Sequence, residues 1–315
     1  MICDSKLKIA ISNLGWIDKG NLWIYNNSEN NIRTVFLSES RYLNIFDGSA
    51  DYFSVSHNYE DSIFEISIHH FSQPEIILCK LIFNNYKTDI TGDVDLIKYI
   101  PKYYVAGFTL NGEYKTHLIS IHDKSIKIDD SKIEWFQKGN FDFGYQGLTG
   151  VTEYNDELLF CVQRDGSIYR VNKESNQLVA KIELAMHFGN PKVTFNKNKT
   201  ILFTDDYDTL IRINPSTWKI EKQTRFQNAY QGTNQFIGSY SFNKNKNLIT
   251  LARPFSSDVV MIDNNLNIKY YCKIGRQPLE SVVLDNKKVI ARDWKSGDFL
   301  TGTMKFRFFW NRQLT

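Results

Sequence analysis

The chain has 315 residues and a formal net charge of +3, with 38 basic and 35 acidic residues interleaved along it. Hydrophobic residues make up 42% and charged residues 23%, a balance that excludes a disordered, collagen-like or coiled-coil chain. A dedicated nucleic-acid-binding protein is disfavoured, because such proteins carry a basic excess that neutralises phosphates. The aromatic share of 14% is high, and aromatic side chains favour β-strands.

The first residues and the cysteines predict a cytoplasmic protein. Residues 1–8 are charged and lack the apolar stretch of a secretion signal, and no apolar run approaches the ~20 residues of a membrane span. The four cysteines, at positions 3, 79, 161 and 272, have no zinc-binding or CxxC spacing. We therefore expect no membrane contact, and we expect Cys161 to be buried, unpaired and unreactive.

Predicted strands in the first half of the chain occur in pairs joined by turns. The three pairs are residues 10–13 with 21–26, 53–56 with 64–69, and 105–108 with 117–122. In the second half the same arrangement is more regular. Two identical FNKNK pentads, at 195–199 and 242–246, each lie between apolar segments and predict a hairpin turn.

The segments that follow these turns also repeat. Residues 160–172, 202–214 and 251–263 each contain a strand, a polar turn and a second strand that ends in Ile or Val followed by Asn or Asp. Residues 290–302 form a looser fourth copy. With the three earlier pairs this gives seven copies, starting near positions 10, 53, 105, 160, 202, 251 and 290. A spacing of roughly 40 to 55 residues is typical of one four-stranded propeller blade.

The sequence therefore predicts an all-β fold, a seven-bladed β-propeller of four-stranded antiparallel blades, in one domain over residues 1–315. A β-sandwich is the alternative, and residues 181–190 could form either a short helix or a strand followed by a loop. The N-terminal copy begins with its second strand, and residues 304–310 are strand-like. We expect the two termini to pair in one joint blade, because that protects the edges.

A resemblance supports this prediction. Residues 274–285, preceded by 258–263, resemble the turn-plus-strand unit of YVTN-type and NHL-type repeat propellers. The resemblance covers the last three or four copies. It implies the fold only, since such propellers include lyases, lactonases and pure binding modules.

Blade topology predicts where binding residues lie. The connections after the second and fourth strands of each blade share one end of the blades, here called the first face. The Asn/Lys turns fall on the second face, where we expect them to be solvated. Loops on a rigid scaffold are the usual place for binding groups. The candidate ligand-binding residues on the first face are Gln146, Gln163, Arg164, Asp206, Gln231, Arg253, Arg276, Arg292, Asp293 and Trp294.

Arg253 and Arg292 occupy matching positions in neighbouring copies, each after an alanine. We expect the two guanidinium groups to share an acidic partner or an anionic ligand, which they could hold by forked hydrogen bonds. The alternative is that each pairs with a nearby carboxylate, such as Asp206 or Asp293. An Asp cluster could also bind a hard cation, but adjacent carboxylates on a strand point in opposite directions. We expect no metal and no cofactor.

His57 and His187 are the candidate catalytic residues, because a first-face histidine could act as a general base near neutral pH. His69, His70, His117 and His122 lie on or next to predicted third strands and are expected to be structural. Serine-triad, Cys–His and phosphate-loop signatures are absent from the sequence.

Two functions remain open. The first is binding of a small polar, anionic molecule at the mouth of the central channel, with a lyase or hydrolase reaction suggested by the fold. The second is a protein-interaction scaffold without catalysis. A deep polar mouth would favour the first, and a shallow mouth with an exposed apolar rim would favour the second.

Overall fold

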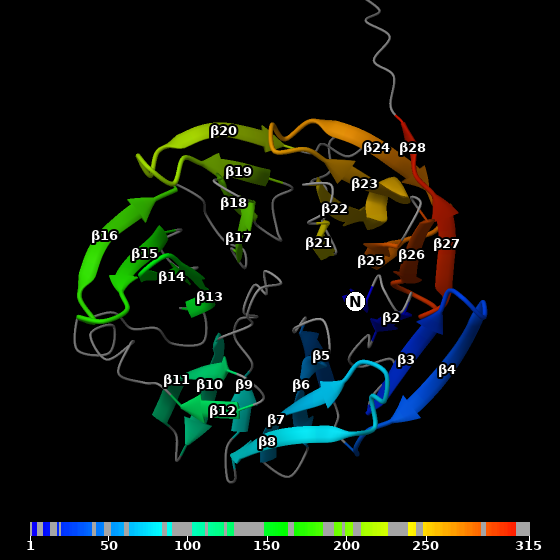
Figure 1. Cartoon of the computed structure of the whole chain (residues 1–315), viewed down its shortest axis with the longest axis horizontal. Coiled ribbons are helices and arrows are strands. Elements are labelled where there is room, and N and C mark those ends of the chain that lie inside the picture. The colour runs from blue at the N-terminus through cyan, green and yellow to red at the C-terminus, as the bar shows by residue number, and fades with distance from the viewer. Residues whose placement is uncertain are drawn as a thin grey trace, which may run out of the picture.

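The computed structural model describes residues 2–4, 9–12, 18, 20–39, 42–46, 52–59, 63–83, 87–89, 103–110, 113–122, 125–128, 148–162, 167–184, 192–196, 199–203, 209–225, 239–243, 248–284 and 288–306. Within these ranges the strands form seven antiparallel sheets. Figure 1 shows the sheets arranged around a common centre, with last strands such as β4, β16, β20 and β24 at the outer rim. The only helical turn in the described ranges is the 3₁₀ turn η2 (Pro254–Ser256).

The first three sheets come from the N-terminal half, and each contains four strands that follow one another in the chain. They are β1 (Ile2–Asp4), β2 (Ile9–Ser12), β3 (Asn21–Asn26) and β4 (Asn31–Phe36); β5 (Tyr42–Phe46), β6 (Tyr52–Tyr59), β7 (Ile63–His70) and β8 (Ile77–Phe83); and β9 (Lys87–Asp89), β10 (Tyr103–Leu110), β11 (Glu113–His122) and β12 (Ser125–Ile128).

The remaining four sheets repeat this order, with a change at the C-terminus. They are β13 (Leu148–Tyr154), β14 (Glu157–Val162), β15 (Ser167–Asn172) and β16 (Leu178–Glu183); β17 (Lys192–Asn196), β18 (Lys199–Phe203), β19 (Thr209–Ile213) and β20 (Ile220–Arg225); β21 (Ser239–Asn243), β22 (Leu248–Arg253), β23 (Asp258–Ile262), β24 (Ile268–Lys273) and the added β28 (Lys305–Phe306); and β25 (Pro278–Val283), β26 (Lys288–Asp293) and β27 (Phe299–Thr303).

The core lies between neighbouring sheets and is built mainly from their second and third strands. All five residues of β23 are buried, whereas β4 on the outer rim is almost entirely exposed. Leu210 of β19, for example, packs against Ile249 and Val260 of the next sheet. Apolar residues from both faces of the inner strands therefore hold adjacent sheets together, as expected where sheets pack face to face.

The predicted copies agree with this topology. Each of the seven predicted starting positions falls in the second strand of a sheet, from β2 to β26. The two FNKNK pentads join first and second strands, since Asn196 pairs with Lys199 and Asn243 pairs with Leu248. The alternative of a helix over residues 181–190 is wrong up to residue 183, which ends β16, and residues 185–190 lie outside the described ranges.

The two ends of the chain differ from the prediction. The N-terminal copy does have an inner strand, because β1 pairs with β2 through Ile2 and Ile11. At the other end, Lys305 and Phe306 of β28 pair with β24 of the preceding sheet. Within the described ranges, no sheet combines strands from both termini, and the last sheet has three strands. The expected joint blade is therefore not observed there.

Side chains join the first and last sheets instead. Ala10 and Tyr25 of the first sheet pack in one apolar cluster with Val282 and Ile290 of the last. Polar contacts add to this junction, since Ser12 donates a hydrogen bond of 2.7 Å to the carboxylate of Glu280. The two sheets thus lie side by side and share a core.

A repeated turn explains the Asn or Asp that ends so many third strands. After β3, β15, β19 and β23, the side-chain Oδ1 accepts hydrogen bonds from two backbone amides further along the turn. Short polar side chains form such turns readily, because they mimic the backbone. The residues are Asn26, Asn172, Asn214 and Asp263, all on the second face.

Candidate functional site

Six of the predicted site residues lie outside the described ranges, so their roles stay predictions. These residues are Gln146, Gln163, Arg164, His187, Asp206 and Gln231. His57 is described only in its backbone. It lies inside β6, where it pairs with Leu43 and Glu65, and so it is not in the turn where the sequence placed it.

The histidines predicted to be structural lie on third strands, as expected. His69 is completely buried, and its ring stacks on Phe53. Its Nδ1 donates to the carbonyl oxygen of Pro74 at 2.7 Å, and its Nε2 accepts from the hydroxyl of Ser67 at 2.7 Å. Burial lowers the pKa of His69 to about 4, although the bond to Pro74 opposes this shift. His69 is therefore neutral at pH 7 and acts as a structural group.

Five predicted ligand-binding residues are described and lie at the first-face ends of their sheets. Three are at the ends of strands β22 and β26 (Arg253, Arg292 and Asp293), and two are in the loops that follow β24 and β26 (Arg276 and Trp294). Arg253 ends β22, and its guanidinium forms a fork on the carboxylate of Asp258, with distances of 2.7 and 2.6 Å. Asp258 faces Arg253 across the β22–β23 hairpin. This pair is largely buried, with side-chain exposures of 13% and 11%.

Arg292 has a different partner. Its side chain is 1% exposed, and one terminal nitrogen lies 2.9 Å from the carboxylate of Asp18, which lies between β2 and β3 in the chain. Its Nε donates to the carbonyl of Gly297, and its guanidinium lies over the rings of Trp23 and Phe299. The expectation that Arg253 and Arg292 share one acidic partner is therefore wrong. The residue opposite Arg253 is an aspartate, whereas the residue opposite Arg292 is Phe299, so the two side chains take different routes.

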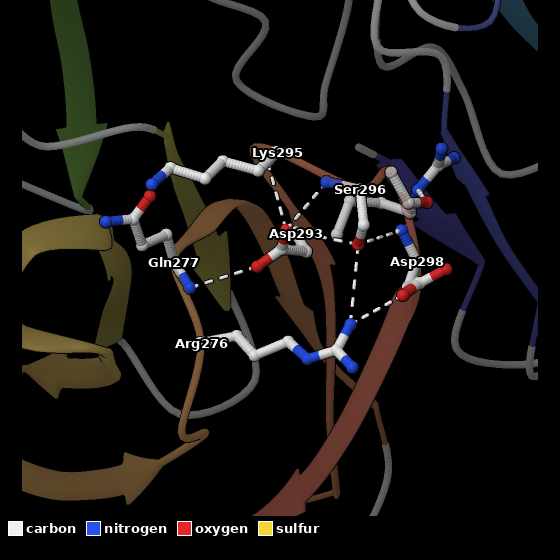
Figure 2. A network of polar contacts seen from close by, with 8 residues as sticks. Arg276, Gln277, Asp293, Lys295, Ser296 and Asp298 are labelled. Carbon is white, nitrogen blue, oxygen red and sulfur yellow. Dashed lines mark hydrogen bonds and ion pairs between the residues drawn. The ribbon is translucent and has the colours of Figure 1, made fainter.

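Asp293 organises the turn that follows β26 (Figure 2). Its Oδ1 accepts from the backbone amides of Lys295 at 3.0 Å and Ser296 at 2.8 Å, and from the Ser296 hydroxyl at 3.1 Å. Its Oδ2 accepts from the backbone amide of Gln277 at 3.1 Å. Burial raises the pKa of the Asp293 carboxyl, but the hydrogen bonds from Ser296, Gln277 and Lys295 outweigh burial and lower it below its ordinary value.

Arg276 lies beside this turn and is more than half exposed. Its guanidinium contacts the carboxylate of Asp298 at 2.5 Å and the Ser296 hydroxyl at 3.4 Å, as Figure 2 shows. The side-chain exposures of the Arg276–Asp298 pair are 53% and 58%. Hydrogen bonds from Ser296 and Arg276 lower the pKa of Asp298. An ion pair this exposed contributes little to stability and can be exchanged for another partner.

Backbone hydrogen bonds join three first-face loops into one unit. The amide of Ile274 donates to the carbonyl of Ser257 at 3.0 Å, and the amide of Trp294 donates to the carbonyl of Gln277 at 2.8 Å. Ser257 has a left-handed backbone (φ 52°), which allows the chain to leave η2 and enter β23. We call residues 254–257, 274–277 and 293–298 the shoulder.

The shoulder carries an aromatic pair with cations around it. The rings of Phe255 and Trp294 are 6.2 Å apart and inclined at 41°, and Phe255 is 38% exposed. Lys295 is exposed on the Asp293 turn, and the exposed Lys273 at the end of β24 donates to the carbonyl of Ser256 at 2.8 Å. Neither lysine forms an ion pair with a carboxylate within the described ranges. Trp294 and Arg276 were predicted from the sequence, whereas Phe255, Lys295 and Asp298 were not, although Phe255 lies two residues after Arg253 in the same predicted turn.

The described ranges contain no group of three or more His, Cys, Asp or Glu residues that could hold a metal ion. In those ranges, too, no helix has the length and apolar character needed to cross a membrane.

No protein-family model matches this sequence, and no curated protein matches it. Solved structures do match it. The β-propeller domain of Cps50 (Swd1) from Myceliophteria thermophila is similar at a TM-score of 0.63 and 11% identity, covering 96% of this chain and 94% of that one. A chain of the mitotic checkpoint complex is similar at 0.58 and 11% identity, covering 97% and 85%. The periplasmic gluconolactonase PpgL from Pseudomonas aeruginosa is similar at 0.56 and 10% identity, covering 95% and 98%. At these identities the likeness establishes the fold alone, and the chain has the fold of a β-propeller.

Proposed function

We propose that this protein is a protein-interaction module that docks a partner on its first-face shoulder. One observation carries the proposal: the loops of the shoulder are held in place, and two of their side chains are exposed. Backbone hydrogen bonds fix the three loops against one another, while Phe255 and Arg276 remain open to solvent. Exposed aromatic and arginine side chains on a fixed backbone are typical of binding hot spots, since little conformational entropy is lost on docking.

The degree of exposure favours a large partner over a small molecule at this site. Small-molecule sites enclose most of the ligand surface, whereas the side chains of Phe255, Arg276 and Lys295 are all exposed. A small ligand on such a surface would keep most of its hydration. A protein partner brings its own surface and buries these side chains itself.

The architecture that we propose for this module is a ring of seven blades in one domain over residues 1–315. Seven described sheets and seven sequence copies support the count. The shared core of the first and last sheets, with the buried Arg292–Asp18 pair, supports closure by side-chain packing in place of strand exchange. We also propose a cytoplasmic location, in keeping with the free thiols of Cys79 and Cys272.

Binding of a small polar, anionic molecule at the channel mouth is the second candidate function, with a lyase or hydrolase reaction as its enzymatic form. The fold likeness to a gluconolactonase favours it. Its remaining candidate residues, such as His187, Gln146 and Arg164, lie outside the described ranges. Thermal-shift measurements with an anion panel test this candidate, and a rise in melting temperature on adding one anion would support it.

Selection of a random twelve-residue peptide library on the immobilised full chain tests the first proposal. We expect the selected peptides to lose binding to the Phe255→Ser variant and to keep binding to Ile220→Ser. Ile220 is a matched control, because it is exposed to a similar degree on the outer strand β20. Peptides that bind the Phe255→Ser variant as tightly as the unmodified chain would overturn the proposal.

A further inference from the structure

We propose that the partner segment that docks on the shoulder is an acidic peptide with an apolar side chain among its carboxylates. This inference rests on the proposed function and adds the chemistry of the partner. Charge on the shoulder and the position of the aromatic pair carry it.

The charge around the aromatic pair is unevenly satisfied. Arg253 is matched by Asp258, and the carboxylate of Asp293 is buried and accepts four hydrogen bonds. Lys273 and Lys295 are exposed, and no carboxylate within the described ranges forms an ion pair with either. Arg276 is matched by the exposed Asp298, so the two lysines are the exposed charges of these loops that have no carboxylate partner within the described ranges. The charge that they leave at the surface is positive, and carboxylates of a partner would complement it.

The aromatic pair, in which Phe255 is exposed and Trp294 is partly buried, lies beside Lys273 and Lys295. Phe255 belongs to η2, while Trp294 directly precedes Lys295 on the Asp293 turn. Lys273 is tied to the same loop through its bond to Ser256. An apolar side chain placed on Phe255 and Trp294 would bring the flanking residues of an extended peptide over the cations. Arrangements of this kind combine apolar burial at the centre with charge pairing at the rim.

Asp298 competes with the carboxylates of a partner for Arg276. Its carboxylate forms an ion pair with the guanidinium of Arg276, and both side chains are more than half exposed. A carboxylate of the partner would have to displace Asp298 or bind beside it. Removing the Asp298 charge would therefore free Arg276 and relieve repulsion. This gives the proposal a variant that strengthens binding, which general damage to the fold cannot do.

The experiment measures fluorescence anisotropy of the full chain with three labelled peptides. The first is rich in glutamate around one central tryptophan, and in the others every glutamate is replaced by glutamine or by lysine. We expect binding of the glutamate peptide only, weakening as salt rises. The double variant Arg276→Gln, Lys295→Gln should weaken it about tenfold or more, and Asp298→Asn should tighten it by about threefold.

Matched controls lie on the second face. Lys219→Gln and Glu174→Gln change exposed charges on comparable turns and should leave the affinity unchanged. Equal binding of the glutamine or lysine peptide, or weaker binding by Asp298→Asn, would overturn the acidic partner. If library selection then still yields peptides that need Phe255, the docking function stands and only the partner chemistry is wrong. If the glutamate peptide binds equally well to the shoulder variants, it binds elsewhere and the acidic partner is overturned, and if library peptides do not need Phe255 either, the docking function fails as well.

Discussion

The turn that begins at Asn172 and the turn that begins at Asp293 have almost the same hydrogen bonds. In each, Oδ1 accepts from the amides two and three residues on, at 3.0 and 2.8 Å, and from a serine hydroxyl at 3.1 Å. In each, a left-handed residue closes the turn: Asn176 with φ 55° and Gly297 with φ 72°. The Asn172 turn follows a third strand and the Asp293 turn follows a second strand, so they lie on opposite faces.

The two turns differ in their contacts with other parts of the chain. The second carboxylate oxygen of Asp293 accepts from Gln277 in the neighbouring loop, whereas Asn172 has an amide nitrogen in place of that acceptor. The residue before Asp293 is the buried Arg292, which donates to Gly297 and pairs with Asp18, whereas the residue before Asn172 is Val171. The same turn therefore joins neighbouring loops on the first face, because the carboxylate of Asp293 and the buried cation of Arg292 both contact residues outside the turn.

Arg292→Ala should have the largest effect of the changes that test this comparison. It removes the guanidinium that pairs with the buried carboxylate of Asp18, and removing one member of a buried pair costs about 3 to 5 kcal/mol. Urea unfolding followed by circular dichroism measures the loss. The double change Arg292→Met, Asp18→Asn should recover much of it, since it removes both charges. A loss below about 1 kcal/mol for Arg292→Ala would mean that the pair does not hold the junction.

Asp293→Ala should come next. It removes the acceptor of three turn hydrogen bonds and of the bond from Gln277, and we expect a loss of about 2 to 3 kcal/mol. The matched change Asn172→Ala removes the turn bonds alone and should cost about 1 kcal/mol. Both are measured by urea unfolding. Equal losses for the two variants would show that the link to Gln277 contributes nothing.

The sequence predicted the parts of the fold that repeat. All seven second strands were located, because each copy places a β-type run before a polar turn. The Ile-Asn and Val-Asn ends were noticed in the sequence, and the structure explains them by the repeated side-chain turn. The pairing at the ends of the chain was predicted wrongly, since the two-residue β28 carries no signal for the strand with which it pairs.

The candidate site was predicted less completely, because its contacts join distant parts of the chain. Asp18 and Arg292 are 274 positions apart, and nothing in the local sequence of either indicates the other. The matching positions of Arg253 and Arg292 were evident in sequence, but their partners depend on the residue opposite each across its hairpin. Periodicity gives the end of the blade on which a residue lies and leaves the direction of its side chain open.

Gly297→Ala should have a smaller effect than either change above. Gly297 has a positive φ of 72°, a conformation in which a Cβ is unfavourable, so we expect a loss of about 1 kcal/mol. Gly297→Asn should cost only a few tenths, because Asn176 adopts the same conformation in the matching turn and asparagine tolerates it. Thermal unfolding of the two variants distinguishes them. Equal losses would mean that contacts at this position matter more than the backbone conformation.

The pH dependence of stability should show the smallest difference between the two turns, because burial opposes the hydrogen bonds at Asp293. The pKa of its carboxyl is lower in the folded chain than the value of about 4 expected when unfolded. Its contribution is therefore fully present above about pH 4 and is lost as the pH falls through the folded pKa. Asp293→Asn removes this contribution, so the difference in unfolding free energy between the unmodified chain and the variant should shrink on acidification.

Asn172→Asp is the matched test on the second face. A carboxylate there would gain no amide like that of Gln277, so we expect a smaller acid-dependent difference from urea unfolding at a series of pH values. A difference as large as that at Asp293 would mean that the turn alone, without its neighbouring loop, stabilises the charge.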